Sequence, residues 1–168
     1  LVLHGDISVD DSRRLPSGTN YVAASDCSDG IGNWDREGNW YCSSSTYGTS
    51  FYIRSVPSEQ ETGTMKDIVD LPTVADGATT YLATLMVRVY STNYYAGLEV
   101  EALDSSANVM EVLANTSTTT SGWQRLSAEV TPPSGAAQIR LTVRSQRYNH
   151  IDLIYFGTIE EPTFDTEL

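Results

Sequence analysis

Residues 136–157, AAQIRLTVRSQRYNHIDLIYFG, decide the fold class of this chain. In the first half, apolar and polar side chains alternate, with Ile139, Leu141 and Val143 on one face. This alternation is typical of a strand with one buried face. A polar turn then leads into a second apolar run that ends at Gly157. The segment therefore predicts a pair of strands that ends a β domain.

Asp152 is the one acidic residue of the second apolar run, and it stands between Ile151 and Leu153. A carboxylate in such a strand needs a cation, hydrogen-bond donors or water, because burying it without a partner is costly. We favour a cation. The alternative is pairing with a nearby Arg or His side chain or a backbone N–H.

The rest of the chain repeats the strand pattern between clusters of Gly, Ser, Asn and Asp, without an amphipathic helix pattern. The predicted fold class is all-β, a β-sandwich jelly roll of two antiparallel sheets. The other expected strands are residues 2–9, 21–25, 49–56, 65–71, 79–91, 95–103, 108–114 and 123–131. The low-complexity residues 115–121 are expected to form a solvated turn.

The length of 168 residues suits one domain with a full core. We assign residues 1–158 to that domain, and we expect the acidic, Pro-interrupted residues 159–168 to be a tail or linker. The net charge of −12 opposes binding to nucleic acid. No apolar run has the length of a membrane span, so we expect no membrane insertion.

Cys27 and Cys42 are the only cysteines, and they enclose a segment rich in Gly, Asp, Asn and Trp with no evident regular structure. A disulfide between them would close a loop of about 15 residues and stabilise the fold by roughly 3 kcal/mol. We expect this bridge and therefore a secreted or extracellular protein. The alternative is a pair of reduced thiols in the core.

Short motifs along the chain resemble those of jelly-roll carbohydrate-binding modules of families four, nine and twenty-two. The closing motif is also similar to family six. In chain order the motifs are His4-Gly5-Asp6-Ile7-Ser8, Tyr81-Leu82-Ala83-Thr84-Leu85-Met86-Val87-Arg88-Val89, Gly122-Trp123-Gln124-Arg125-Leu126, Pro132-Pro133-Ser134-Gly135-Ala136 and Ile151-Asp152-Leu153-Ile154. The resemblance implies a non-catalytic module that binds a polysaccharide or oligosaccharide. It also implies a larger multidomain protein, either a secreted carbohydrate-active enzyme or a surface protein.

The same resemblance implies a structural calcium ion near the crossing of the first and last strands. It carries the ligand positions onto Asp152, Asp6 and Ser8. The family has Glu where this chain has Ser8, and a second Asp where it has Leu153, so the site lacks a carboxylate. Backbone carbonyls or water would fill the gap, because Ca²⁺ accepts six to eight oxygen ligands of mixed kind.

Sugar recognition needs a flat apolar surface for the C–H faces of the ring and planar polar groups for the hydroxyls. Strand parity places one set of suitable side chains outward: Tyr52, Arg54, Arg88, Tyr90, Glu99, Glu101, Arg140, Thr142 and Arg144. If these share one sheet, their arginines form a groove suited to an anionic glycan, either a uronate or a sulfated polymer. The alternative is that the arginines neutralise neighbouring glutamates.

A second candidate surface is the aromatic group between the cysteines, namely Trp34, Trp40 and Tyr41. Large aromatics in a pinned loop lose little entropy when they bind a ligand. The alternative is that Trp34 and Trp40 close the end of the core. We assign Trp123 to the edge of the core.

Catalysis has little support in the sequence. The two histidines, His4 and His150, stand near no nucleophile motif. Glu99 and Glu101 lie two residues apart on one strand, a spacing expected by chance in so acidic a chain. We therefore expect no enzyme activity. The alternative function is a structural or adhesive jelly-roll domain of a virion or cell-surface protein that makes protein contacts.

Overall fold

The computed structural model describes residues 18–23, 25, 27, 28, 30–32, 34–45, 48–53, 62–146 and 148–159. Within these residues there are ten strands: β1 (Asp35–Glu37), β2 (Trp40–Ser45), β3 (Gly48–Ile53), β4 (Thr62–Asp70), β5 (Tyr81–Val89), β6 (Ala96–Leu103), β7 (Val109–Thr118), β8 (Gly122–Val130), β9 (Gln138–Gln146) and β10 (His150–Thr158). Among the same residues, no helix has the length and hydropathy to cross a bilayer.

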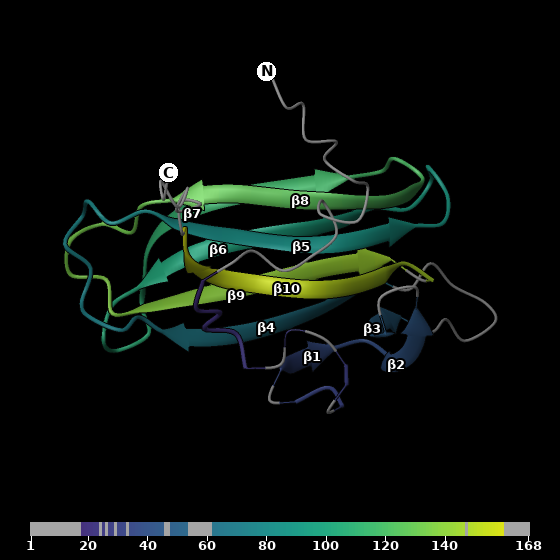
Figure 1. Ribbon diagram of the computed structural model, residues 1–168, viewed down its shortest axis with the longest axis horizontal. Coiled ribbons are helices and arrows are strands. Elements are labelled where there is room, and N and C mark those ends of the chain that lie inside the picture. Colours follow the sequence, from purple (N-terminus) through teal and green to yellow (C-terminus); the bar gives the residue numbers. More distant parts are fainter. Residues whose placement is uncertain are drawn as a thin grey trace, which may run out of the picture.

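The strands form two five-stranded antiparallel sheets, with the order β1-β4-β9-β6-β7 in sheet 1 and β2-β3-β10-β5-β8 in sheet 2. Figure 1 shows β5, β8 and β10 of sheet 2 in front of β4, β6 and β9 of sheet 1. The predicted β-sandwich is confirmed. The closing strands are also where the sequence placed them, but β9 and β10 do not pair with each other. Each lies at the centre of a different sheet.

Alternating apolar side chains fill the space between the sheets. Ile139, Leu141 and Val143 of β9 are fully buried, as their alternation predicts. From the opposite sheet, Tyr81 stacks on Phe156 with ring centroids 5.3 Å apart. Each square ångström of apolar surface removed from water contributes about 25 cal/mol. This burial fixes which face of each strand points inward and which is left for other contacts.

A β-bulge interrupts the alternation in β10, where the register with β5 shifts between Asp152 and Tyr155. Leu153 has the left-handed φ of 50°. A bulge adds one residue to a strand without adding one to its partner. Ile151 and Ile154, three residues apart, can therefore both enter the core.

The segment that precedes the sheets is tied to the end of β10. Asn20 forms an isolated bridge with Gly157, and its side-chain amide donates to the Ile154 carbonyl at 3.0 Å. A Cβ at Gly157 would collide with the Thr19 carbonyl oxygen and the Tyr155 ring, so the crossing requires glycine. The described residues of the strand expected at 21–25 form no strand; the Tyr21 N–H donates to the Phe156 carbonyl, and the Ser25 carbonyl accepts the Ile154 N–H.

Two further expectations about local structure were wrong. β7 extends to Thr118, through part of the tract predicted as a turn, because residues 115–118 pair with β6. β1 and the start of β2 lie in the segment between the cysteines, where no regular structure was expected. The expected first strand, residues 2–9, lies outside the described residues.

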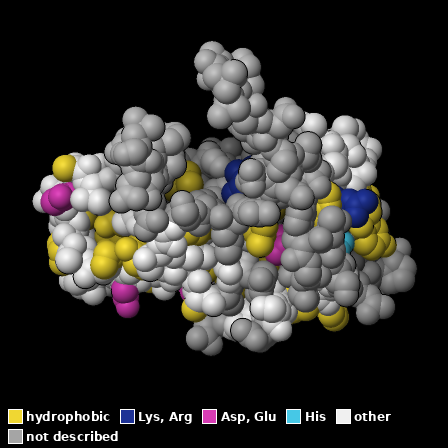
Figure 2. Space-filling view, viewed as in Figure 1, with side chains coloured by type: hydrophobic (Ala, Val, Ile, Leu, Met, Phe, Trp, Pro, Cys, Tyr) yellow, Lys and Arg dark blue, Asp and Glu magenta, His cyan; other side chains and the backbone are white. Residues whose placement is uncertain are grey.

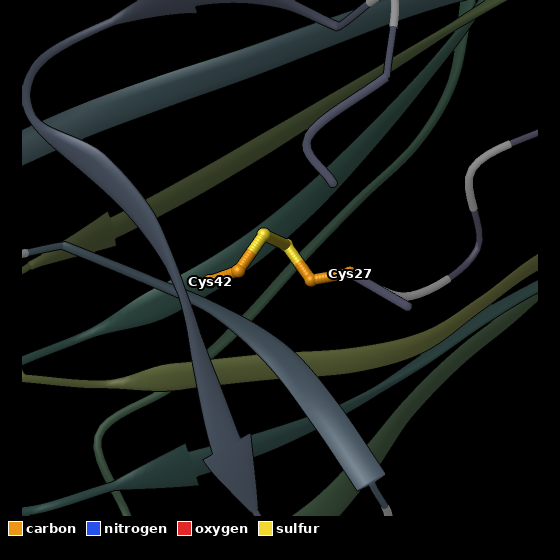
Figure 3. Close-up of a disulfide and its surroundings, with 2 residues drawn as sticks. All are labelled: Cys27 and Cys42. Carbon is orange, nitrogen blue, oxygen red and sulfur yellow. A yellow bond between two sulfur atoms is a disulfide. The ribbon is translucent and has the colours of Figure 1, made fainter. Parts of the chain in front are cut away.

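The predicted disulfide between Cys27 and Cys42 is confirmed, with the two Cα atoms 5.5 Å apart (Figure 3). Cys42 belongs to β2, and Cys27 is buried in the segment that precedes β1. The bridge therefore fastens the edge of sheet 2 to a segment that contributes few strand hydrogen bonds of its own.

Replacing both Cys27 and Cys42 by serine should lower the free energy of unfolding by about 3 kcal/mol, because the unfolded chain regains the entropy of a 15-residue loop. Urea denaturation followed by tryptophan fluorescence measures this difference. The unmodified protein unfolded under reducing conditions is the control and should match the double variant. Equal midpoints for the oxidised protein and the double variant would contradict the prediction.

Candidate functional site

The outer face of sheet 1 carries two ion pairs between β9 and β6. Arg140 Nε donates to Glu101 Oε2 at 2.6 Å, and these residues are directly opposite each other in register. Arg144 reaches Glu99 with two hydrogen bonds, Nη2 to Oε1 at 2.9 Å and Nη1 to Oε2 at 3.3 Å. Asn115 of β7 also donates to Glu99 Oε2, at 3.1 Å. We call Glu99, Glu101, Arg140 and Arg144 the charged face.

The glutamates set the electrostatics of this face. The hydrogen bond from Glu101 is the largest cause that raises the pKa of Arg140, and Glu99 does the same for Arg144. Both guanidinium groups therefore remain charged and are compensated locally. For these two arginines, the alternative that they neutralise neighbouring glutamates is confirmed.

A hollow of about 420 Å³ borders the charged face. It is lined by Asp35, Lys66, Asp67, Ile68 and Arg140. Ile68 is 46% exposed and offers an apolar surface among polar groups. Burial raises the pKa of the Asp67 carboxyl above its ordinary value. Apolar surface, cations and carboxylates thus meet at one place.

The outer face of sheet 2 carries a different group, formed by Arg88, Tyr90, Trp123 and His150, which we call the Arg88 cluster. Arg88 of β5 lies opposite His150 of β10 on one side and opposite Trp123 of β8 on the other. Its guanidinium carbon lies 4.8 Å from the centre of the Tyr90 ring, a cation–π distance. Arg88 and Tyr90 are exposed, whereas Trp123 and His150 are partly buried.

The groove residues predicted from parity do not share one sheet. Arg88 and Tyr90 belong to the sheet 2 side, as does the backbone of Tyr52, which lies opposite His150. The sheet 1 members are Glu99, Glu101, Arg140, Thr142 and Arg144. Arg54 lies outside the described residues. A single groove therefore does not form, because β5 belongs to one layer and β6 and β9 to the other.

The two tryptophans between the cysteines are not on the surface. Trp34 and Trp40 are each only 4% exposed, and Trp34 packs edge-on against Phe51. Trp40 Nε1 donates to the carbonyls of Glu37 and Thr64 at 3.0 and 3.1 Å, which satisfies the indole N–H inside the core. Their prediction as sugar-binding residues was wrong, and the alternative that they close the core is right. Tyr41, by contrast, is 42% exposed.

The sequence interpretation missed Trp123 and His150 as surface residues. Trp123 was assigned to the core edge, but it lies across from Arg88, with its ring 6.4 Å from that of His150. The sequence contained a signal for this position. Side chains of a strand alternate between its two faces, so Trp123, three positions before the core residue Leu126, is expected on the outer face.

Asp152 is the one predicted calcium ligand whose surroundings the structure describes. Its carboxylate is fully buried, and Oδ1 accepts the Leu153 N–H at 2.9 Å. Asp6 and Ser8 lie outside the described residues. Among the described residues, no group of three or more His, Cys, Asp or Glu side chains is placed to hold a metal ion. The described part of the chain therefore supplies one carboxylate of the predicted set.

No protein-family model matches this chain, and no curated protein matches it. Solved structures do match. A family 61 carbohydrate-binding module in complex with β-1,4-galactotriose has a TM-score of 0.64 and 16% identity, over 83% of this chain and 99% of that one. The xylan-binding domain of family 22 has a TM-score of 0.58 and 14% identity, over 83% and 96% of the two chains. The fold is that of β-sandwich carbohydrate-binding modules.

The enzymatically active domain of tailspike protein 4 from bacteriophage CBA120 has a TM-score of 0.65 and 13% identity. The match covers 83% of this chain and 21% of the tailspike chain, so this sandwich is similar to one part of a longer protein. At these identities the likeness shows the fold. The resemblance found in the sequence is thus confirmed for the architecture.

The ion pair between Glu99 and Arg144 should contribute about 0.5 kcal/mol to stability, because the Arg144 side chain is 36% exposed and solvent screens the pair. A double-mutant cycle with Glu99→Gln, Arg144→Gln and the double variant, each unfolded in urea, isolates this coupling. Raising the salt concentration should shrink it. A coupling of zero at low salt would show that the geometry stores no interaction energy.

Proposed function

We propose that this domain is a non-catalytic carbohydrate-binding module that binds a polysaccharide or oligosaccharide chain on the outer face of sheet 1. The observation that carries the proposal is the charged face itself, four side chains held in fixed pairs beside a hollow with an exposed isoleucine. Two of the proteins with the same fold are, by their descriptions, a complex with galactotriose and a xylan-binding domain.

The chemistry of the charged face suits sugar hydroxyls. A hydroxyl both donates and accepts hydrogen bonds, and this face offers carboxylate acceptors next to guanidinium donors. Because the ion pairs already restrict these side chains, little conformational entropy remains to be lost on binding. Ile68 supplies an apolar patch against which the C–H face of a sugar ring could pack.

Local neutrality defines the kind of sugar that fits here. Arg140 and Arg144 are each compensated by a glutamate, so this face holds no surplus of positive charge among its four members. Binding a carboxylate or sulfate would require one of these pairs to open. The charged face therefore suits a neutral, hydroxyl-rich chain, and an anionic glycan needs a different surface.

The context we propose is a secreted, multidomain protein in which this module accompanies a carbohydrate-active enzyme or a surface protein. Two observations support it. The disulfide between Cys27 and Cys42 is favoured in an oxidising compartment. The similar sandwich in the tailspike chain is one part of a longer polypeptide.

Glu99→Gln should weaken binding to a neutral polysaccharide about tenfold, because it removes a charged acceptor and releases Arg144. Affinity gel electrophoresis at fixed salt, with xylan and β-1,4-galactan in the gel, measures the dissociation constants. Glu129→Gln on β8 is the matched control, since it removes the same charge from an exposed position in sheet 2.

Two results would contradict the proposal. One is equal retention of Glu99→Gln, Glu129→Gln and the unmodified protein by a polysaccharide that binds. The other is no retention by any glycan in a broad panel, which would favour the structural or adhesive function.

We also propose that calcium binds at Asp152 and stabilises the fold. The support is a fully buried carboxylate at the bulge of β10, the position at which the family resemblance places a calcium ligand. The ion would be held by Asp152 together with Asp6, Ser8 and backbone or water oxygens, and it would offset the buried charge.

Chelation with EDTA should lower the melting temperature, because an ion at 100 times its dissociation constant stabilises the folded state by about 2.7 kcal/mol. Asp152→Asn should have a lower melting temperature that no longer responds to EDTA or added Ca²⁺. Asp70→Asn, at an exposed position of β4, is the control and should keep the response. An unmodified protein whose melting temperature ignores EDTA would exclude structural calcium.

A further inference from the structure

The register of sheet 2 aligns five backbone positions, one from each of its strands, in one row across the sheet. Tyr41 lies opposite Tyr52, Tyr52 opposite His150, His150 opposite Arg88, and Arg88 opposite Trp123. With adjacent strands about 4.8 Å apart, the row is about 19 Å long. The sequence puts an aromatic residue, a histidine or an arginine at each of these positions, and the side chains of Tyr41 and Arg88 are exposed.

The Arg88 cluster consists of three positions of this row together with Tyr90, and ring contacts assemble it. The Tyr90 ring lies 5.8 Å from that of His150, which lies 6.4 Å from the Trp123 indole. Tyr90 is 47% exposed, so the assembly faces water rather than the core. Figure 2 shows a basic, a histidine and several hydrophobic side chains gathered at the right-hand end of this face, where β5 ends and β10 begins.

A buried asparagine holds the cluster in place. Asn149 is fully buried, and its Oδ1 accepts the Tyr90 N–H at 3.2 Å while its Nδ2 donates to the Tyr95 carbonyl at 2.9 Å. This residue connects the turn before β10 to the end of β5 and the start of β6. Because the backbone beneath Tyr90 is fixed in this way, the ring keeps its position without a ligand.

The Arg88 cluster differs from the charged face in how its positive charge is balanced. Among the described residues, no carboxylate forms an ion pair with Arg88. Burial and the charge of Arg88 lower the pKa of His150, so at neutral pH the histidine is uncharged. Arg125, two residues along β8 from Trp123, donates to the Thr84 hydroxyl at 3.3 Å.

We propose that the Arg88 cluster is a second sugar site, separate from the charged face, that binds a uronic acid residue within a mostly neutral polysaccharide. The guanidinium of Arg88 accommodates the carboxylate as a two-pronged donor. Tyr90 and Trp123 supply the flat surfaces against which the C–H face of the ring packs. His150 fills the space between the two rings.

Two opposing charge effects indicate which ligand fits the Arg88 cluster. The whole chain carries a charge of −12, which repels a densely charged polyanion such as a nucleic acid or a sulfated polymer. A lone carboxylate on a neutral chain meets less of this long-range repulsion, because salt screens it within about 8 Å, and it still meets Arg88 at contact distance. An isolated acidic sugar therefore matches both the local and the overall charge.

Methyl glucuronide and methyl galacturonide are the probes, with methyl glucoside and methyl galactoside as neutral counterparts. Titrated into the isotope-labelled full chain, either uronide should shift the NMR signals of the Trp123 indole N–H and the Arg88 Nε–H. The neutral glycosides should leave them in place. Arg88→Gln should weaken the uronide affinity about tenfold. Arg36→Gln, which removes one exposed positive charge from β1, is the matched control and should not.

Tyr90→Ala is the second variant and should also weaken uronide binding, through loss of the stacking surface. The proposal is overturned if uronides and neutral glycosides shift the two signals equally, if neither shifts them, or if Arg88→Gln binds as tightly as Arg36→Gln. Failure of the charged face to bind neutral polysaccharide would leave this titration unaffected. The two proposals can therefore fail separately.

Discussion

The burial of alternating side chains from β9 and β10 is the constraint on which the rest of this structure depends. Each strand lies at the centre of its own sheet, with two neighbours on either side. Because the strands pair in register, the inward residues of β9 and β10 fix which face of every neighbouring strand points into the core. Each neighbouring strand therefore has only its outward residues left for binding, and these are divided between two surfaces that face away from each other.

This division gives arginine two different states in one small domain. Arg140 and Arg144 lie on β9, next to a strand that carries glutamates on the same face, and both arginines form ion pairs. Arg88 lies on the other sheet among aromatic neighbours, and its guanidinium packs on a ring instead. The difference does not come from the arginines, whose strands have the same alternation. It comes from which strand the fold places next to them.

The sequence predicted what depends on a single strand. The outward position of Arg88 and Tyr90 and the inward position of Leu141 follow from parity alone, and the structure agrees. Strand order cannot be obtained in this way. The pairing of Glu99 with Arg144 requires β6 to lie beside β9, and these strands are separated in the chain by β7 and β8. For its described members, the predicted groove was therefore a set of outward residues assigned to one surface instead of two.

Burial of the aromatic residues also could not be predicted from single strands, but for a different reason. Trp34 precedes a strand of three residues, too short to show an alternation, so nothing local separated a core tryptophan from an exposed one. Contacts with the other sheet bury Trp40, since its indole N–H donates to the carbonyls of Glu37 and Thr64 in sheet 1. Tyr41, one position along, faces away from this pair and remains exposed. Where strands are short, contacts made outside the strand itself determine which aromatic residue is buried.

The two outer surfaces bear on how the domain can engage a polymer. The backbones of two packed sheets lie about 10 Å apart, and the space between them is filled by the core, so no ligand can pass through. One sugar chain could contact both the charged face and the Arg88 cluster only by wrapping around an edge of the sandwich. Sites that share no side chain and lie on opposite faces should act additively. Occupation of both by different chains would therefore make this domain a connector between two polysaccharides, whereas occupation of one would make it a simple anchor.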